Sequence, residues 1–327
     1  MLNPKKLLLT TFLMTGVLCG PACADLIVTQ GMMGVQRYTN DGVSLGTLIA
    51  PGTGGLTDAR GVAVGPGGDL FVADFANDNI LRFSSGGAFL GVFASGASVD
   101  TPLGVAFGTG GDMFVASAGP ASNIARVDGT TGAVTNANFT SGNSLVLGGP
   151  QFLTFGPELA VTDIAGHLFR FDATTGVSTF EAALDNPMGV AFDAAGNLFV
   201  AQRISDNVLM FPAGGGASSI LIPNGAFAGA PADVKIGPDG LLYVATGNGI
   251  YRFDESGALV DSFGTGGRYM AFTELTVVPE PGTWALLGAG MLGMVLVRFR
   301  EVSPRAISRS GCAFTLAFGR VEPTHLR

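Results

Sequence analysis

The chain has 327 residues, of which 47% are hydrophobic and only 13% are charged, and it contains 51 glycines. Its formal net charge is −8, but residues 25–278 carry 22 Asp and Glu against nine Lys and Arg, a formal charge of −13. Such an acidic domain disfavours nucleic acid and anionic membrane surfaces, because both require concentrated positive charge. Divalent cations, cationic partners and neutral glycans remain as ligands, with solubility alone as the simplest explanation.

Residues 1–24 are predicted to be a signal peptide. Lys5 and Lys6 precede an apolar run over residues 7–18, which is too short to span a bilayer, and Ala22 and Ala24 form a small-x-small cleavage site. We expect export and cleavage after Ala24, with an uncleaved anchor as the alternative. Of the three cysteines, two lie in this leader and the third is Cys312, so the exported domain has no disulfide.

Residues 61–83 (GVAVGPGGDLFVADFANDNILRF) contain three short apolar runs separated by turns rich in Gly, Asp and Asn. Runs of this length predict three antiparallel strands. The pattern recurs from residues 104, 152, 189 and 233, at intervals of 43, 48, 37 and 44 residues. These intervals are close to the repeat of a β-propeller with four strands per blade.

The two ends of the domain indicate the number of blades. Residues 25–30 match the second strand of the repeat and residues 34–39 match the third, but no first strand precedes them. The missing strand is found at the other end, in RYMAFTEL (268–275). The sequence therefore predicts an all-β, six-bladed β-propeller over residues 25–278, with one blade built from both termini and no open sheet edge.

Residues that break the repeat are better site candidates than residues that recur. Arginines recur on five of the predicted third strands, which indicates a packing role; they are Arg37, Arg82, Arg126, Arg170 and Arg252. The candidates for binding lie at or just beyond the ends of second strands, where propeller loops surround the channel mouth. They are Gln30, Thr162, Gln202 and Arg203.

Catalytic residue types are scarce in the domain. The domain has one histidine, His167, and no cysteine. A catalytic Ser-His-Asp or Cys-His arrangement therefore has almost no residues from which it could be built. Carboxylate or metal chemistry stays open, with Asp163, Asn207 and Asn248 as candidate ligands. The Gly-rich segments are predicted to be hairpin turns. No cofactor is predicted, and a divalent cation belongs only to the enzyme alternative.

Two resemblances add to this interpretation. The segments VADFANDNILRF (72–83) and GVAFDAAGNLFV (189–200) resemble NHL-type propeller repeats. The second is to the PEP-CTERM sorting signal of Gram-negative bacteria, over residues 279–300: Pro279-Glu280-Pro281, an apolar stretch from Trp284, and a basic cluster with Arg298 and Arg300. This resemblance implies processing by an exosortase-type enzyme, in organisms that export polysaccharide.

The apolar stretch, residues 284–299, is expected to be a short transmembrane helix. Its 16 residues span about 24 Å, against roughly 30 Å for the hydrocarbon core. Trp284 suits the outer interface, and Arg298 and Arg300 suit the cytoplasmic side. Residues 301–327 form a basic tail that we expect to be disordered.

The sequence thus predicts an exported propeller at the cell envelope, anchored or released after processing, that acts as a binding or scaffold module. Its expected partners are extracellular polysaccharide or an envelope protein. The alternative is a metal-dependent propeller enzyme similar to the gluconolactonase or lyase families, and a third option is a structural protein without a small ligand. A channel lined by three or more Asp, Glu, Asn or His side chains would favour the enzyme.

Overall fold

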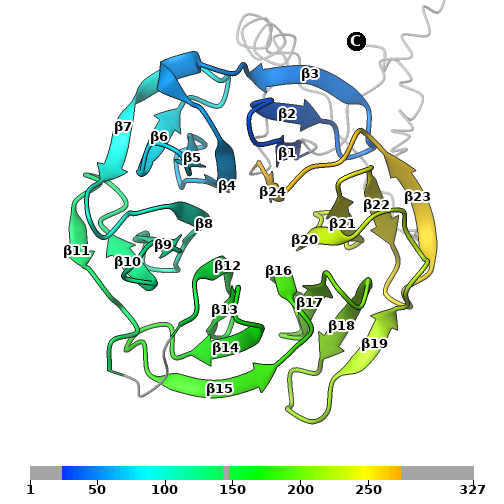
Figure 1. Cartoon of the computed structure of the whole chain (residues 1–327). Helices are drawn as coiled ribbons and strands as arrows, with labels where there is room; N and C mark the ends of the chain where they lie inside the picture. The colour runs from blue at the N-terminus through cyan, green and yellow to red at the C-terminus, as the bar shows by residue number, and fades with distance from the viewer. Residues whose placement is uncertain (1–23, 143–146, 274–327) are drawn as a thin grey trace, which may run out of the picture. The chain divides into compact units, whose positions relative to one another are not determined.

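The computed structural model describes residues 24–142 and 147–273, which form six antiparallel sheets of four strands each around a central axis (Figure 1). The predicted six-bladed β-propeller is confirmed. The last strand, β24 (Tyr269–Phe272), pairs with the first, β1 (Leu26–Thr29), so residues from both ends of the domain share one blade. This pairing closes the ring and removes the open sheet edges that it would otherwise have.

The blades are named A to F in chain order. Blade A contains β24, β1, β2 (Val35–Tyr38) and β3 (Ser44–Ile49). Blade B contains β4 (Ala59–Val64), β5 (Leu70–Asp74), β6 (Asn79–Phe83) and β7 (Phe89–Ser95). Blade C contains β8 (Pro102–Phe107), β9 (Met113–Ser117), β10 (Asn123–Val127) and β11 (Val134–Asn136).

The second half of the ring repeats this order. Blade D contains β12 (Pro150–Phe155), β13 (Leu159–Asp163), β14 (His167–Phe171) and β15 (Ser178–Ala183). Blade E contains β16 (Pro187–Phe192), β17 (Leu198–Gln202), β18 (Asn207–Phe211) and β19 (Ser219–Ile222). Blade F contains β20 (Pro231–Ile236), β21 (Leu242–Thr246), β22 (Ile250–Phe253) and β23 (Leu259–Phe263). A short 3-10 helix, η1 (Thr53–Gly55), precedes β4.

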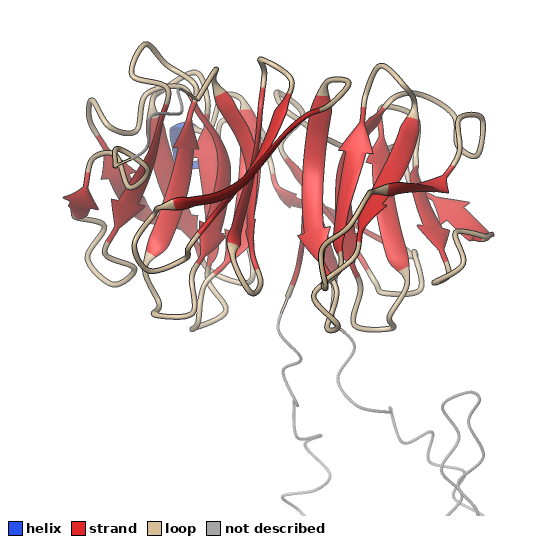
Figure 2. Ribbon diagram, turned by 90° about the horizontal axis from the view of Figure 1, so that it is seen from below, coloured by secondary structure: helices blue, strands red, loops and turns tan. Residues whose placement is uncertain are grey.

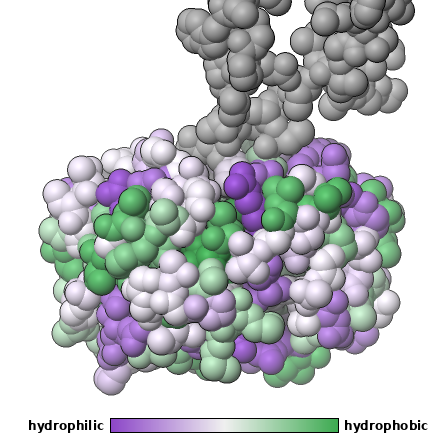
Figure 3. Space-filling model, turned by 90° about the horizontal axis from the view of Figure 1, so that it is seen from above, coloured by the Kyte–Doolittle hydropathy of each residue, from purple (hydrophilic) through white to green (hydrophobic). Residues whose placement is uncertain are grey.

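Burial decreases from the middle of each blade to its rim. The second strands are buried along their whole length, because neighbouring blades cover both of their faces, and this explains why β5 reads LFVAD instead of alternating. Each fully buried Val, Leu or Phe there contributes roughly 1.5–3 kcal/mol. The fourth strands form the outer wall, where Leu45, Leu90 and Ile220 are more than half exposed. Figure 3 shows such apolar patches between polar ones on this wall.

The loops gather on two opposite faces of the ring (Figure 2). We call the "exit face" the face formed by the loops between first and second strands, such as 65–69, and between third and fourth strands, such as 128–133. We call the "mouth face" the face formed by the loops between second and third strands, such as 30–34, and by the loops that enter each blade, such as 50–58.

The ends of the described chain lie on the exit face. In blade A, β24 ends and β1 begins where the other blades have the loop between first and second strands. The ends are bonded to each other: the Asp25 N–H donates to Thr273 Oγ1 at 2.8 Å, and the Thr273 N–H donates to the Asp25 carbonyl at 2.9 Å. Thr273, the last described residue, therefore lies on the exit face.

The predicted signal peptide, transmembrane helix and basic tail lie outside the described residues, apart from Ala24, which is buried. Within residues 24–142 and 147–273, no helix has the length and apolar character needed to cross a membrane.

Candidate functional site

One ring of six equivalent positions on the first strands decides how open the central channel is. Each position precedes the residue that pairs with the central valine of the second strand. The six are Gly61, Gly104, Phe152, Gly189, Asp233 and Tyr269. A Cβ on Gly61 would clash with the carbonyl oxygen of Leu103 in the next blade, and a Cβ on Gly104 with that of Gln151. Glycine therefore lets neighbouring blades approach closely at this level.

Two aromatic rings fill the channel at the same level. Phe152 of blade D and Tyr269 of blade A come from opposite blades and stack, with centroids 4.2 Å apart and planes inclined by 21°. They are only 2% and 7% exposed. The Tyr269 hydroxyl donates to the Gln151 carbonyl at 3.4 Å, and burial raises the pKa of Tyr269, which keeps the phenol neutral. The channel is thus closed by a packed apolar pair.

Asp233 is the one carboxylate in this ring, and it is fully buried. Its Oδ2 accepts the Met270 N–H at 2.8 Å, and its Oδ1 accepts the Val234 N–H at 2.8 Å and Lys235 Nζ at 3.1 Å. Burial raises the pKa of Asp233, and the Lys235 ammonium partly opposes this shift. The bond from Met270 ties blade F to the closing strand β24, and the bonds from Val234 and Lys235 lie within β20, so the carboxylate is occupied by structural partners.

The three predicted metal ligands come from three different blades. Asp163 is buried at the end of β13, Asn207 Oδ1 accepts a hydrogen bond from Gln202 Nε2 at 3.0 Å, and Asn248 is exposed on the mouth face. Each of the three forms its hydrogen bonds within its own blade. No cluster of three or more His, Cys, Asp or Glu suited to a metal occurs among the described residues. A divalent cation needs several converging oxygens, and the one carboxylate in the ring of first-strand positions, Asp233, already has hydrogen-bond partners on both oxygens. The role of the three as ligands stays a prediction.

The last residue of the second strand, or the next one, forms a clamp on the mouth face. In every blade its side chain bonds the backbone of the loop that enters that blade. Asp163 Oδ2 accepts the Gly148 N–H at 2.8 Å, and Gln202 Oε1 accepts the Asp185 N–H at 2.9 Å. The six clamps are Gln30, Asp74, Ser117, Asp163, Gln202 and Thr246. Different residue types thus perform the same task, which is to hold the loop that enters the blade. Because the residue type changes from blade to blade, the sequence repeat does not reveal this shared role.

The other predicted binding residues, Thr162 and Arg203, have different surroundings. Thr162 is buried, and its hydroxyl donates to the Met188 carbonyl at 2.7 Å, which joins blades D and E. Arg203 is exposed on the mouth face, where its backbone N–H donates to the Asn186 carbonyl at 3.0 Å. Gln202 and Thr162 are therefore committed to packing, whereas Arg203 is accessible. Their roles in binding stay predictions.

The repeated arginines hold the exit face together, as their recurrence predicted. Each guanidinium pairs with a carboxylate of its own blade. Arg82 and Arg126 also lie over the rings of Phe71 and Phe114, with their Cζ atoms 5.6 and 5.8 Å from the ring centroids. The pairs are Arg37–Asp25, Arg82–Asp69, Arg126–Asp112, Arg170–Glu158 and Arg252–Asp261.

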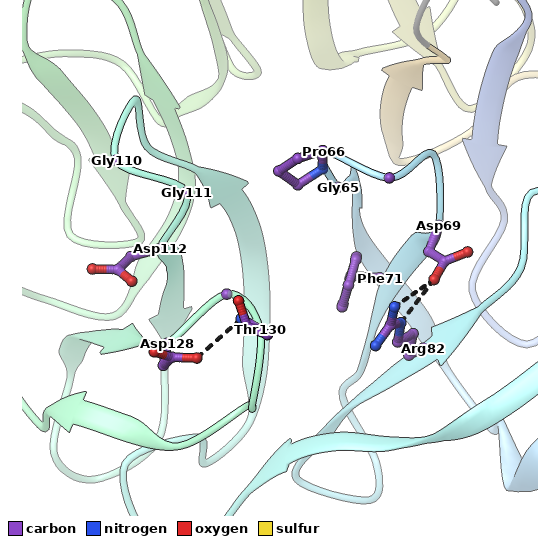
Figure 4. Close-up of a pocket in the computed structure, with 12 residues that line it drawn as sticks. Gly65, Pro66, Asp69, Phe71, Arg82, Gly110, Gly111, Asp112, Asp128 and Thr130 are labelled. Atoms are coloured by element: carbon purple, nitrogen blue, oxygen red, sulfur yellow. Dashed lines mark hydrogen bonds and ion pairs between the residues drawn. The ribbon is translucent and has the colours of Figure 1, made fainter.

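A cleft of about 420 Å³ lies between blades B and C on the exit face (Figure 4). Its carboxylates all have partners. Asp69 bonds Arg82 at 2.7 Å, Asp112 bonds Arg126 at 2.6 Å, and Asp128 accepts the Thr130 N–H at 3.0 Å. The pKa of Asp128 is lowered, and the hydrogen bond from the Thr131 backbone N–H contributes most to this shift. Each carboxylate of this acidic cleft is held through one oxygen by a contact of its own turn or blade, and the described residues contain no cluster of three or more His, Cys, Asp or Glu suited to a metal.

A second cleft, of about 430 Å³, lies on the mouth face and is formed by loops of blades A, B and F. We call it the "mouth-face cleft". The side chains that give it its chemistry are Gln30, Met32, Met33, Asp58, Arg60 and Arg268. Glycines and Thr265 complete its wall.

The two arginines of the mouth-face cleft differ in how they are held. Asp58 binds Arg60 through two hydrogen bonds, at 3.1 and 2.7 Å, and the guanidinium lies 4.8 Å from the Phe75 ring centroid. Arg268 is anchored by its backbone N–H, which donates to the Thr29 carbonyl at 2.9 Å, while its side chain is exposed. One cation is thus fixed and the other is available.

The available cations of the propeller are few. Of the nine Lys and Arg in residues 25–278, seven form ion pairs within the described chain. The two side chains without an ion pair or hydrogen bond to another described residue are Arg203 and Arg268. Both are exposed and both lie on the mouth face.

The sequence prediction missed the arginines and methionines of the mouth-face cleft. The signal was present, however, because Arg60 and Arg268 occupy the same register position on the first strands of adjacent blades. The six residues at this position are Arg60, Leu103, Gln151, Met188, Ala232 and Arg268. Charge is therefore confined to two neighbouring blades, which an alignment of the first strands alone would have shown.

Comparisons with known proteins support the sorting signal and the fold. The family model of the PEP-CTERM protein-sorting motif matches residues 277–300, and the implied processing is by an exosortase. A comparison with curated protein sequences finds no match.

Several solved structures share the propeller. One chain of a nidogen/laminin complex is 17% identical, with a TM-score of 0.62, over 76% of this chain and 98% of that one. A gluconolactonase from Xanthomonas campestris is 19% identical, with a TM-score of 0.53, over 76% and 89% of the two chains. A streptogramin B lyase is 16% identical, with a TM-score of 0.56, over 75% and 82%. At these identities the likeness extends to the fold alone.

Proposed function

We propose that this exported propeller is a binding or scaffold module of the cell envelope. The observation that carries the proposal is the filled channel. Phe152 and Tyr269 stack across it, three of the six ring positions are glycine, and Asp233 is bonded on both oxygens. Propellers host unrelated functions on one fold, so the site has to decide between them. A ligand-poor channel favours binding at the loops.

The mouth face is the binding face in this proposal. The PEP-CTERM match begins at residue 277, four residues beyond Thr273 on the exit face. A segment that is retained at the envelope would turn the exit face toward it and leave the opposite face for partners. The mouth face also carries the two unpaired cations and the exposed methionines Met32 and Met33. Extracellular polysaccharide and envelope proteins are the partner classes.

The enzyme alternative makes a different prediction about metals. It rests on the fold shared with a gluconolactonase and a lyase, and it requires carboxylate or amide ligands that converge on the channel. A metal at about 100 times its dissociation constant would stabilise the folded chain by roughly 2.7 kcal/mol. We expect calcium, zinc and manganese to leave the unfolding midpoint of the purified full chain unchanged.

Thermal unfolding with each metal, and then with chelator, tests this expectation. A metal-specific rise of the midpoint that chelator reverses would contradict the proposal and justify a screen of lactone substrates. Fractionation of producing cells provides the second test. The propeller should be found with the envelope or the medium, and Glu280→Ala in the sorting motif should change the ratio of these two fractions.

A further inference from the structure

We infer that the mouth-face cleft binds a peptide segment that presents a carboxylate next to an apolar side chain. The inference rests on the proposed binding role and names the partner class for it. The occupant would be a loop or a chain end of another exported protein. Three properties of the cleft support this inference: its local charge, its preformed wall and its exposed thioethers.

Local charge is the first property. The cleft holds Arg60 and Arg268 against Asp58, a formal charge of +1 inside a domain whose charge is −13. Asp58 already occupies Arg60 through two hydrogen bonds. Arg268 has no ion-pair partner within the described part of the chain and is exposed. Since a guanidinium binds a carboxylate through paired N–H groups, Arg268 provides the recognition element for an acid.

The wall of the cleft is built before any ligand arrives. Gln30 Nε2 donates to Thr265 Oγ1 at 2.9 Å and to the Gly266 carbonyl at 2.8 Å, which fixes the loop that enters blade A. Gly31 and Ala59 exchange backbone hydrogen bonds of 3.2 Å, which joins blade A to blade B beneath the cleft. A preformed wall lowers the entropy that a ligand loses on binding.

The methionines supply the apolar contact. Met32 and Met33 are 78% and 64% exposed, among the highest values for large apolar side chains in the described residues. Their turn is closed by the Gln30 N–H, which donates to the Gly34 carbonyl at 2.9 Å, so both side chains are held outward. Exposed apolar groups beside a cleft mark interaction sites, and flexible thioethers adapt to varied side chains.

The same lining favours a peptide over a saccharide. No aromatic residue lines the cleft, and the ring of Phe75 is already covered by Arg60. Sugars usually need such a ring as a stacking surface, whereas peptides use apolar contacts and charge. A Cβ on Gly247 would have nothing within 4 Å, so this part of the wall leaves room for a peptide backbone, and the volume of about 430 Å³ is within the range of ligand pockets.

The test selects ligands with the full chain immobilised on beads and a random peptide library displayed on phage. We expect the enriched peptides to share one Asp, Glu or C-terminal carboxylate beside an apolar residue. Arg268→Ala should weaken their binding by about tenfold or more, since a charge-assisted hydrogen bond contributes roughly 1.5–3 kcal/mol. Replacing the peptide acid by its amide should cause the same loss, and the two changes together should not add.

Matched variants control for charge and for apolar surface. Arg82→Ala removes a cation from the exit face, and Ile204→Ala removes an exposed side chain from the mouth face outside the cleft. Neither should change binding by more than about twofold, whereas the double variant Met32→Ala, Met33→Ala should weaken it about fivefold.

Three results would overturn the inference. If the peptides bind wild type and Arg268→Ala equally, the mouth-face cleft is not their binding site, although the propeller still acts as a binding module. If no peptide is enriched from the library, the ligand of the cleft is not a peptide. Thermal unfolding with metals then still tests the proposed binding role independently. Binding of oligogalacturonate that depends on Arg268, without peptide binding, would assign the cleft to an acidic saccharide.

Discussion

The exit face and the mouth face of this propeller are built by the same strands but differ in how regular they are. On the exit face, five blades repeat one arrangement, an arginine of the third strand paired with a carboxylate of its own blade. On the mouth face, six blades use four residue types to clamp the entering loop. Two of the blades also add an arginine at the channel mouth.

The difference separates structure from function. A contact that recurs in every blade solves a problem that every blade has, such as closing a turn. A feature confined to one side of the ring, such as the pair Arg60 and Arg268, does not meet a structural need that all blades share, so it is a candidate for function. The asymmetric features also lie on the face opposite the chain ends. Substitutions on the two faces should therefore differ in how much stability they cost.

The largest effect is expected from Asp74, a clamp whose carboxylate accepts four hydrogen bonds. It is fully buried, and its carboxylate accepts from the Thr57 N–H and hydroxyl, the Asp58 N–H and the Asn77 amide, at 2.7–3.1 Å. Asp74→Ala leaves the Thr57 and Asp58 N–H groups without this acceptor, while the Asn77 amide keeps the Gly55 carbonyl, and it should cost about 3–4 kcal/mol. Urea unfolding measures the loss.

Ser117→Ala is the matched control for this prediction. Ser117 holds the equivalent position in blade C but makes one side-chain bond, to the Ser98 carbonyl at 3.0 Å. We expect a loss of about 1 kcal/mol. Equal losses for the two variants would contradict the idea that each mouth-face loop is clamped to a different degree.

The second prediction compares two exit-face arginines. The Arg252 side chain is 10% exposed, bonds Asp261 at 2.7 Å and donates to the Asn40 carbonyl at 2.7 Å, which links blade F to blade A. Arg252→Met should cost about 2 kcal/mol, because it removes the hydrogen bonds of a nearly buried guanidinium to Asp261 and to the Asn40 carbonyl. The Arg82 side chain is 41% exposed, so Arg82→Met should cost less than about 1 kcal/mol. If Arg82→Met lowered the unfolding free energy more than Arg252→Met does, the prediction would be contradicted.

The third prediction concerns acid sensitivity of the exit face. Asp128, Asp172 and Asp254 follow third strands and accept bonds from their own turns. The pKa of Asp172 is lowered first by the Thr175 hydroxyl, and the pKa of Asp254 first by the Ser256 hydroxyl. Since the unfolded chain takes up protons at the ordinary value of 3.8, stability from these groups is present above that pH. It is lost as the pH falls toward their lower folded values.

Asp172→Asn isolates this contribution. The difference in unfolding free energy between wild type and variant should be larger at pH 7 than at pH 3, as measured by urea unfolding. Asp233 changes stability in the opposite direction, because burial raises its folded pKa and stability from it falls as the pH rises. Asp233 is present in both wild type and Asp172→Asn, so its contribution cancels in the difference between their unfolding free energies. A difference that stays constant with pH would contradict the prediction.

The smallest effect on stability is expected at the proposed site itself. Arg268 is exposed, and only its backbone is held, by the Thr29 carbonyl. Arg268→Ala should therefore change the unfolding free energy by no more than about 0.5 kcal/mol. Thermal unfolding checks this value, and a substantial loss would mean that Arg268 supports the fold and is not reserved for a ligand.

The fold could be predicted from the sequence, whereas the site could be predicted only in part. Blade number and closure followed from repeats whose second strands are covered on both sides, as in LFVAD. The clamps were missed because Asp163 and Gln202 differ in type and looked like departures from the repeat. The stack of Phe152 on Tyr269 joins residues 117 positions apart, and nothing local in the sequence indicates it.

Labelling of the two faces on intact cells tests the central claim most directly. Ile204→Cys on the mouth face and Thr130→Cys on the exit face would be compared in a Cys312→Ser background, since Ile204 lies outside the cleft that a ligand would cover. A membrane-impermeant maleimide with a long polymer should label Ile204→Cys much faster than Thr130→Cys on cells, and both equally after solubilisation. Faster labelling of Thr130→Cys on cells would show that the exit face is the one presented outward, and it would contradict this account.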